Sequence, residues 1–438
     1  MRRPLDSPPS LAFIAWKAGT RVVLQSLRIK NVALAPDLSV DWAPRINLIV
    51  GDNGLGKSFL LDLAWWSLTR TWAGAVALPS GTGVASIEYV VKGKTGKSAS
   101  PVISKFRRED QSWRGEAKKP TMPGIVVYVR VDGGFSVWDP ARNYWRTDPG
   151  RPAAYHFQAK DVWAGLDLGG LRVCEGLERD WVNWQEGRKP IFQALENVLE
   201  SLSPPGERLK PGSPMRLYVG EGRDRPTILV GSQTVPVALA SAGIRRVLAM
   251  AYFLVWVWNE HRVASKLLGR EPDDRFVILI DEPETHLHPR WQRSIVPSLL
   301  SAIRSLAGNE EATAQIVLAT HSPLVAASIE PLFDVEKDDL IHLALEKGRV
   351  ELQQGGWTKQ GDVTNWLVSE TFGLEQARSM ESERAIEAAE AFMRDGKSAV
   401  KGLETKSKIH KELQRLLPAH DPFWPRWLVT TGKVGAAE

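Results

Sequence analysis

Eight consecutive residues have the types and spacing of a loop that holds a polyphosphate. They fit G-x-x-x-x-G-K-[ST] at every fixed position and are Gly51, Asp52, Asn53, Gly54, Leu55, Gly56, Lys57 and Ser58. Glycines let the backbone turn and point its N–H groups inward at the phosphates. Lys57 is expected to reach the β- and γ-phosphates, and the Ser58 hydroxyl can ligate Mg²⁺. The predicted nucleotide-binding set ends with Phe59.

The residues around this loop predict the strand and the helix that must position it. Before the loop, a short apolar set typical of a buried parallel strand is formed by Ile46, Leu48, Ile49 and Val50. From about Ser58, leucines and tryptophans at helical spacing follow. The positive end of that helix adds to the attraction for phosphate.

A second group of polar residues stands at the end of another predicted strand, Phe276 to Asp281, in which five apolar residues precede the aspartate. An α/β sheet presents its ligand groups where such strands end, so Asp281 is placed to hold Mg²⁺. Glu282 is the next side chain and can polarise an attacking water. A positioned general base contributes roughly 10²–10⁴ in rate. The sequence therefore predicts a carboxylate pair for phosphoryl chemistry.

Two further elements could contact phosphate. Gln315 to Thr320 reads as a strand that ends at His321, whose ring could reach the γ-phosphate. Ser241, in Leu239 to Arg246, opens an apolar helix and is a natural N-cap. Its alternative role is that of a second anion-binding helix end.

These four elements, in this order, resemble the ABC-type ATPases of the RecF, SMC and OLD branch, over roughly residues 22–350. GDNGLGKS resembles the Walker A motif, and DEPETHLHP resembles the Walker B motif of OLD-like proteins. ASAGIR stands where that family has LSGGQ, with Ser241 and Gly243 kept. THS resembles the switch-histidine loop.

The resemblance implies ATP and Mg²⁺ as cofactors, with Lys57, Glu282 and His321 as catalytic residues. In that family the nucleotide lies between two head domains. We therefore expect a homodimer or higher homo-oligomer in which Ser241 and Gly243 act on ATP bound to the partner subunit. Gln158, at the end of a predicted strand, is the candidate for the family's Q-loop glutamine and would be a further Mg²⁺ ligand.

The expected fold class is α/β, with a mixed antiparallel β lobe beside a parallel-sheet lobe that carries the phosphate loop. Alternating residues predict antiparallel strands at Val22 to Ile29, Val84 to Val91 and Pro101 to Phe106. No heptad run of three or four repeats is found, which argues against a long coiled coil. The expected parts are an N-terminal tail (1–21), ATPase lobe I with Walker A and the antiparallel β subdomain (22–160), a mainly helical insertion (161–235), ATPase lobe II with the signature, Walker B and switch histidine (236–350), and a C-terminal helical extension (351–438).

Composition limits the setting of the protein. The 438 residues are 43% apolar and 24% charged, as in ordinary globular proteins, and the net charge is +5. Cys174 is the only cysteine, so no intrachain disulfide can form, and a reducing cytoplasm is expected. The longest apolar run, Val247 to Trp258, has 12 residues and is too short to span a bilayer.

The stretch from Lys92 to Lys119 carries nine basic and three acidic residues. One interpretation is a solvated hairpin face. The other is a surface that follows a phosphate backbone, with Trp113 available to stack on a base. The DNA contacts predicted by this second interpretation are Lys105, Arg107, Arg108 and Lys118.

The C-terminal region has no acidic cluster for two-metal nuclease chemistry after Asp339, unlike the OLD nucleases. Size, insert and ending look similar to the ATPase subunit of Septu-type antiphage systems, in which an HNH nuclease is a separate polypeptide. The resemblance thus implies a defence ATPase that controls a partner nuclease. The alternatives are a RecF-like DNA repair ATPase and a nucleotide-sensing scaffold of a PARIS-like complex with little turnover.

Two helices are predicted near the C-terminus, at Ala377 to Met393 and Lys406 to Leu417. After them, His420 to Trp427 offers three aromatic residues and an arginine, the types that dominate interface energies. This segment is predicted to dock a partner. The alternative is that Phe423, Trp424 and Trp427 are core residues of the fold.

Overall fold

The computed structural model describes residues 23–33, 35–93, 100–115, 122–144, 152–308 and 314–434. The predicted tail (1–21) and Lys118 lie outside these ranges. The chain divides into two units between Trp366 and Leu367. The site residues predicted from the sequence all belong to the first unit.

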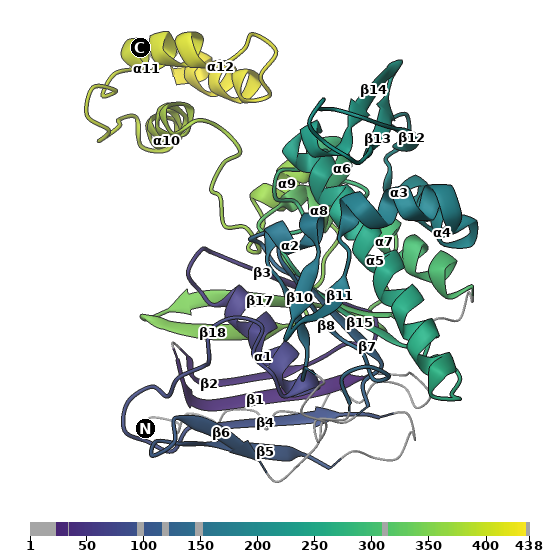
Figure 1. Cartoon of the computed structure of the whole chain (residues 1–438). Helices are drawn as coiled ribbons and strands as arrows, with labels where there is room; N and C mark the ends of the chain where they lie inside the picture. Colours follow the sequence, from purple (N-terminus) through teal and green to yellow (C-terminus); the bar gives the residue numbers. More distant parts are fainter. Residues whose placement is uncertain are drawn as a thin grey trace. The chain divides into compact units, whose positions relative to one another are not determined.

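An eight-stranded sheet forms the centre of the first unit (Figure 1). Strands β17, β3, β16, β15 and β7 are parallel neighbours in that order, while β18, β8 and β9 pair antiparallel. Every residue of β15 and β7 is buried, which is why these strands read as unbroken apolar runs. In lateral order the strands are β18 (Arg349–Gln354), β17 (Asp338–Glu346), β3 (Ile46–Gly51), β16 (Ala314–Ala319), β15 (Phe276–Asp281), β7 (Ile125–Val129), β8 (Phe135–Trp138) and β9 (Tyr155–Phe157).

The register of the parallel strands brings their carboxyl ends to one edge. Asp281 of β15 is level with Ala319 of β16, which in turn is level with Ile49 of β3. The loops after these three strands therefore start side by side. They carry the phosphate loop, Glu282 and His321.

A second, five-stranded antiparallel sheet has the lateral order β2-β1-β4-β5-β6. Helix α1 (Lys57–Thr69) lies between the two sheets (Figure 1), and its Leu61 and Trp65 are fully buried in one core with residues from both. The alternating strands predicted from the sequence are confirmed here. Their bounds are β1 (Leu24–Val32), β2 (Ala35–Asp41), β4 (Ser86–Val91), β5 (Val102–Arg107) and β6 (Ser112–Gly115).

The segment expected to be a mainly helical insertion holds α3 (Leu177–Gly187) and α4 (Lys189–Leu202), but strands as well. The remaining elements are α2 (Ala159–Ala164), β10 (Leu166–Leu168), β11 (Leu171–Cys174), β12 (Lys210–Met215), β13 (Arg225–Val230), β14 (Gln233–Pro236) and the 3-10 turn Val237–Leu239.

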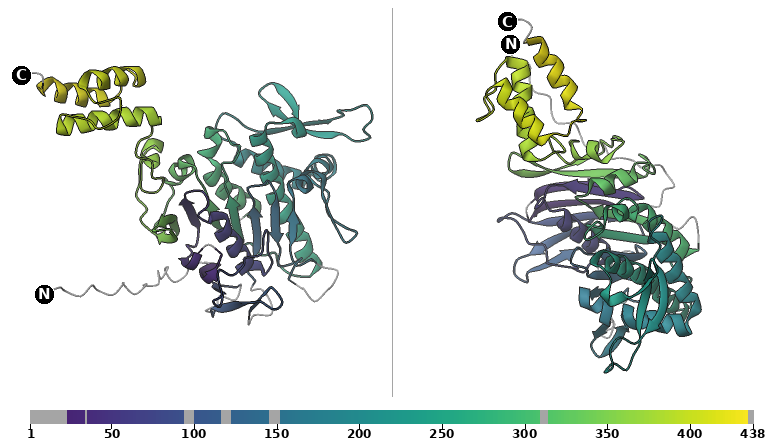
Figure 2. Two further views of the ribbon diagram at one scale, coloured as in Figure 1. Left: turned by 90° about the vertical axis from the view of Figure 1, so that its left-hand side faces the viewer. Right: turned by 90° about the horizontal axis from the view of Figure 1, so that it is seen from above.

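The long helix α5 (Ala242–Leu267) is buried from Arg246 to Val257 and packs against α4 and α7 (Ile295–Ala307). Figure 2 shows the teal and green helices of the first unit from two further sides. Its apolar run is therefore a core helix. Among the described residues, no helix combines the length and apolarity needed to cross a membrane. The short helices of the first unit are α6 (Pro289–Gln292), α8 (Pro323–Ile329) and α9 (Val363–Leu367).

The second unit has its own core, built from α10 (Met380–Asp395), α11 (Lys406–Leu416) and α12 (Phe423–Val434). The first two helices confirm the sequence prediction. Phe423 is 8% exposed and Trp427 is fully buried in this core. The prediction that these two aromatic side chains dock a partner is therefore wrong, because composition alone does not separate a core helix from an interface.

Candidate functional site

The predicted phosphate loop connects β3 to α1 and requires glycine at its first position. Gly51 has φ +139°, and a Cβ atom there would lie 2.3 Å from the Leu343 carbonyl oxygen on the neighbouring strand. Any side chain would separate β3 from β17 at this point. The loop then turns into the N-terminus of α1, whose free N–H groups attract phosphate.

Lys57 lies at the centre of the loop and is 6% exposed. Its ammonium donates to the carbonyl oxygens of Gly51 (2.7 Å) and Asp52 (2.8 Å). Burial lowers the pKa of Lys57, and the carboxylates of Glu282 and Asp281 oppose that shift. The loop thus holds a buried cation where a phosphate bound to its N–H groups would meet it.

The two predicted Mg²⁺ ligands from distant parts of the chain lie together. The Ser58 hydroxyl hydrogen-bonds to the Asp281 carboxylate, which is 3% exposed. Burial raises the pKa of Asp281, while Ser58, Lys57 and Arg246 favour the ionised form. A hydroxyl and a carboxylate side by side fit a Mg²⁺ ion that keeps waters and phosphate oxygens as its other ligands.

Glu282, predicted as the general base, begins the loop after β15 in a left-handed backbone conformation, φ +48°. Its backbone N–H donates to Ala319 O (2.9 Å), and Thr285 Oγ1 donates to its Oε2 (3.2 Å). His321 Nε2 lies 3.6 Å from Glu282 Oε1. Strained residues of this kind cluster at functional sites, where surrounding contacts hold them. Burial, then Lys57, lowers the pKa of His321, which favours the neutral ring.

Glu284 is a site residue that the sequence analysis missed. Its Oε1 accepts hydrogen bonds from Thr320 Oγ1 (2.7 Å) and from the His321 backbone N–H (2.7 Å). It therefore joins the loop after β15 to the loop after β16 and positions His321 next to Glu282. The signal in the sequence was a third acid in DEPE, but the spacing alone does not show which strand end it contacts.

Ser241 caps α5, with Oγ accepting from the Ile244 N–H at 3.4 Å, so its predicted N-cap role is confirmed. Gly243 faces the His286 carbonyl, where a Cβ would be 2.5 Å away. Both residues line a hollow of about 450 Å³, together with His288 and Trp291. Within the described residues, no hydrogen bond or ion pair joins Ser241 or Gly243 to the phosphate loop of the same chain.

Gln158 is exposed at the end of β9, at the same edge of the sheet as Asp281. Two strands separate β9 from β15, so the strands are about 14 Å apart at 4.8 Å per spacing. No contact in the described part of the chain joins Gln158 to Ser58 or Asp281; its backbone N–H donates to Asp161 (2.8 Å). Its role as a Mg²⁺ ligand stays a prediction.

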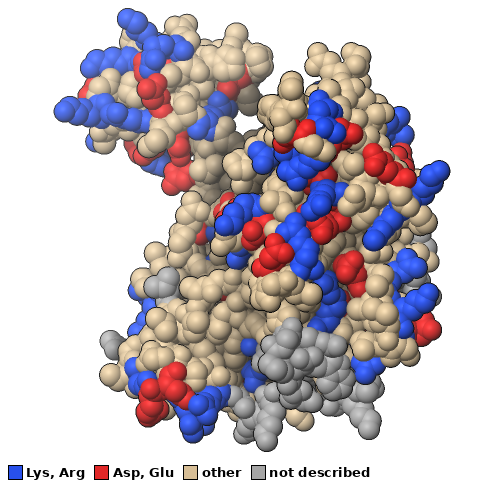
Figure 3. Space-filling model, viewed as in Figure 1, with Lys and Arg blue, Asp and Glu red and all other residues tan. Residues whose placement is uncertain are grey.

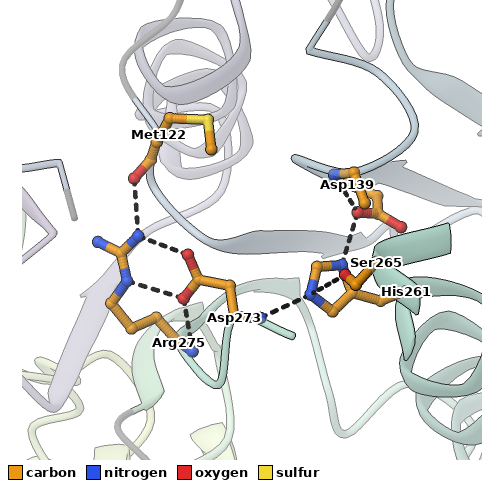
Figure 4. Close-up of polar contacts among 7 residues, drawn as sticks. Met122, Asp139, His261, Ser265, Asp273 and Arg275 are labelled. Atoms are coloured by element: carbon orange, nitrogen blue, oxygen red, sulfur yellow. Dashed lines mark hydrogen bonds and ion pairs between the residues drawn. The ribbon is translucent and has the colours of Figure 1, made fainter. Parts of the chain in front are cut away.

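A buried polar network fastens the far end of α5 to the start of β15 (Figure 4). His261 Nδ1 contacts Asp139 Oδ1 (2.7 Å), and Ser265 Oγ lies 3.4 Å from Nε2. Although this order of groups looks like a hydrolase triad, Nε2 already accepts the Asp273 N–H at 2.8 Å. The histidine therefore cannot take a proton from Ser265, and the network is a structural tie.

The basic stretch from Lys92 to Lys119 is described only in part. Trp113 is not free to stack on a base, because it packs on Phe106 and Trp66 (ring centroids 5.3 and 6.2 Å) and donates to Ala77 O. That part of the prediction is wrong. Lys105 and Arg107 are exposed on β5, and Arg108 donates to Gly81 O (2.6 Å).

The chain matches known ATPases in the region of these motifs. Residues 231–327 match a family model described as "AAA domain, putative AbiEii toxin, Type IV TA system", which covers Ser241, Asp281, Glu282 and His321. The Septu protein PtuA of Bacillus thuringiensis is 21% identical over 372 residues, which are 82% of this chain and 86% of that protein. The chain is similar to PtuA over most of its length. The similarity to Septu-type proteins expected from the size, insert and ending of the chain is thereby confirmed, and the match to an AAA domain implies ATP binding.

Two other similarities are more limited. A protein named "Retron Vc95 probable ATPase", from Vibrio cholerae serotype O1 biovar El Tor, is 40% identical over 53 residues, 12% of this chain and 9% of that protein. The SMC head domain from Thermotoga maritima covers 77% of this chain and 100% of its own, at 15% identity and a TM-score of 0.38. Unlike the retron protein, PtuA is matched over most of both chains.

Proposed function

We propose that the chain is a Mg²⁺-dependent ATPase that dimerises through its ATP-bound heads and controls a partner nuclease in antiphage defence. The observation that carries the proposal is the meeting of three separate segments at one sheet edge. At this edge Ser58 contacts Asp281, and His321 lies beside Glu282. Lys57 directly precedes Ser58 in the chain, and Glu282 directly follows Asp281, so the two pairs and the lysine form one group. Such a set can bind, orient and hydrolyse a terminal phosphate.

Each side chain has a distinct task in this proposal. The loop N–H groups and Lys57 hold the β- and γ-phosphates, and Glu282 takes a proton from the attacking water. His321, held by Glu284 beside Glu282, donates to the γ-phosphate. Mg²⁺ bound at Ser58 and Asp281 would neutralise charge on the β- and γ-oxygens.

Dimerisation is supported by the position of Ser241 and Gly243. They line an open hollow that has no contact with the phosphate loop of their own chain in the described residues. The N-terminus of α5, a 26-residue helix, can then attract the phosphates of ATP bound to a partner subunit.

The defence role is supported by the similarity to the Septu protein PtuA and to the retron ATPase. By the same analogy, the partner would be an HNH-type nuclease made as a separate polypeptide. The second unit has a core of its own, so partner binding and ATP binding can reside in different parts of the chain.

The metal requirement tests the reaction directly. Phosphate release by the full chain is expected with ATP and Mg²⁺, and should fall to background when EDTA removes the metal. Ser58→Ala, which removes one of the two proposed ligands, should raise the Mg²⁺ concentration needed for half-maximal release. Release that is unchanged by EDTA would refute the proposed metal site.

Removal of residues 377–438 tests where a partner binds. The cut leaves Trp366 in place, whose indole N–H donates to Glu330 at 2.7 Å. It removes Arg378 together with Asp421, its ion-pair partner. We expect ATP affinity within twofold of the full chain, and loss of co-purification with the product of the neighbouring gene, which is the candidate for the proposed nuclease.

A gentler variant serves as the control for this truncation. Leu428 and Val429 of α12 are 54% and 58% exposed, so changing both to aspartate should leave the core of the second unit intact. If both the truncated chain and the double variant still retain the nuclease, the second unit is not its docking site.

The outer face of the antiparallel sheet carries the described part of the predicted DNA contacts. Ser86 of β4 pairs with Lys30 of β1 on one side and with Lys105 of β5 on the other. Arg107 is two residues after Lys105 and therefore lies on the same face of β5. None of the three has an ion pair in the described chain, whereas Arg28 and Arg114 pair with acids. On the face in view in Figure 3, charges of both signs are interspersed.

If Lys30, Lys105 and Arg107 contact phosphates, their triple alanine variant should lower the salt slope of duplex binding by about 2.7 units of log K per unit of log salt. The slope can be measured by fluorescence anisotropy at several salt concentrations. A triple alanine variant of Lys397, Lys401 and Lys411 in the second unit removes equal charge and should leave the slope unchanged. Equal slopes for both variants would show that the sheet face is only solvated.

A further inference from the structure

One buried cation beside the site has two side-chain nitrogen atoms without a hydrogen-bond partner in the described part of the chain. Arg246, in the first turns of α5, is 7% exposed, and its Nε and Nη2 atoms have no hydrogen-bond partner among the described residues. Its neighbour Arg245 is different, because its guanidinium is stacked on Trp163 at 4.7 Å. Buried charged groups in native proteins are almost always paired, since an unpaired one costs several kcal/mol.

The edge of the guanidinium that lacks partners is the one that binds anions elsewhere in this protein. Arg45 donates from Nε and Nη2 to the two oxygens of Asp338, and Arg275 does the same to Asp273. These forks match the spacing of two oxygens on a carboxylate or a phosphate. In Arg246 the same fork is formed and buried, but it holds no anion of the described chain.

The surrounding acids attract Arg246 without bonding to it. Asp132, Asp281, Glu282 and Glu284 all act on its charge, although burial has the larger effect and lowers the pKa of the guanidinium. Asp281 is hydrogen-bonded to Ser58 and Glu282 to Thr285, whereas Glu284 uses only Oε1, for Thr320 and His321, and its buried Oε2 has no hydrogen-bond partner in the described chain. The attraction places Arg246 close to the predicted reacting groups but leaves its fork for another anion.

The position of Arg246 relative to the sheet also places its side chain close to the predicted reacting groups. Its Nη1 atom would be 3.9 Å from a Cβ placed on Gly133, in the turn between β7 and β8. This turn follows β7, the strand directly beside β15. It lies at the edge of the sheet where β15 ends with Asp281 and continues into Glu282. Arg246 therefore reaches from helix α5 to the edge of the sheet that carries the proposed phosphate site.

We propose that the Nε–Nη2 fork of Arg246 binds the terminal phosphate of ATP held by the same chain. Resting on the proposed function, this adds a residue that distinguishes a nucleoside triphosphate from a diphosphate. Because Arg246 is five residues after Ser241 on the same helix, the presence of that phosphate would also be transmitted to the start of α5. ATP and ADP would thus differ in how firmly they hold the surface formed by Ser241 and Gly243.

The test compares the affinities of the full chain for a non-hydrolysable ATP analogue and for ADP, in Arg246→Met. Loss of a charged hydrogen-bond pair should weaken analogue binding by roughly 10- to 100-fold and leave ADP binding within about twofold. Arg246→Lys keeps the charge but loses the fork, so its loss should be intermediate. Arg262→Met, at an exposed position further along the same helix, is the matched control, and should bind both nucleotides as the wild type does.

Thermal unfolding without nucleotide separates this role from a structural one. Replacing an unpaired buried charge by an apolar side chain of similar length is neutral or stabilising, so Arg246→Met should unfold at the same or a higher temperature. The analogue should then raise that temperature less than it does in the wild type. A lower unfolding temperature without nucleotide, or equal losses for the analogue and ADP, would overturn the proposal.

Failure of the proposed function would look different. A wild-type chain that binds neither nucleotide would refute both proposals. A wild-type chain that prefers the analogue over ADP, with the same preference in Arg246→Met, would refute only the role of Arg246.

Discussion

Glu282→Gln should keep ATP bound while phosphate release falls by roughly 10²–10⁴, because the amide cannot accept a proton from the attacking water. The substitution is nearly isosteric, so the contact with the Thr285 hydroxyl can persist at the amide oxygen. The measurement is phosphate release in parallel with nucleotide occupancy. Occupancy should equal or exceed that of the wild type, since bound ATP is no longer consumed.

Two variants control this result. Lys57→Ala removes the buried ammonium from the centre of the loop and should abolish ATP binding itself. Glu271→Gln makes the same chemical change at an exposed acid outside the site and should have no effect. Undiminished release by Glu282→Gln would mean that another group activates the water.

The contact between His321 and Glu282 adds a condition to this expectation. A substitution at Glu282 could also lower activity indirectly, by moving the loop that carries His321. Glu284 holds the backbone of that loop through the His321 N–H. Glu282→Gln leaves Glu284 and its hydrogen bonds to Thr320 and His321 intact. The variant therefore tests proton transfer and not the assembly of the site.

Ser241→Arg is expected to block hydrolysis with nucleotide affinity nearly unchanged. The new side chain would fill the hollow beside Gly243 and His286, where the partner's nucleotide is proposed to lie. The phosphate loop of the same chain has no described contact with Ser241, so it should bind ATP as before. The measurements are phosphate release and equilibrium binding at the same protein concentration.

The same substitution also removes a helix cap, which costs about 1 kcal/mol of stability. Ser241→Ala separates the two effects, because it removes the cap without filling the hollow. Ser232→Arg, at an exposed turn, controls for added charge and size. Inactivity of Ser232→Arg would show that any added arginine disturbs the fold.

Mixing variants tests whether the site is shared between subunits. Combining Ser241→Arg with Lys57→Ala should give at most one working site per dimer, formed by the intact loop of one chain and the intact Ser241 of the other. Activity that stays linear in protein concentration down to the monomer range would contradict a shared site.

The sequence by itself determined the elements whose geometry depends on residues close to one another in the chain. The phosphate loop is recognisable because glycine is needed at Gly51 and the lysine must follow at a set spacing. The bounds of β15 follow from its unbroken apolar run, and the cap at Ser241 follows from a hydroxyl three residues before Ile244. Each of these features is encoded within one turn or strand.

Only the tertiary structure decided which of these elements meet and what their side chains bond to. The lateral order of strands places β7 beside β15 and moves Gln158 two strands further away. The same order lets Glu284 reach His321 and leaves the Nε and Nη2 atoms of Arg246 without a hydrogen-bond partner among the described residues. The sequence did not decide burial either, since Trp113 and Trp427 are of a residue type common in binding surfaces, but Trp113 packs against one core and Trp427 is buried in the other. The reason is physical: pairing and burial depend on residues far apart in the chain, whose contacts no local pattern encodes.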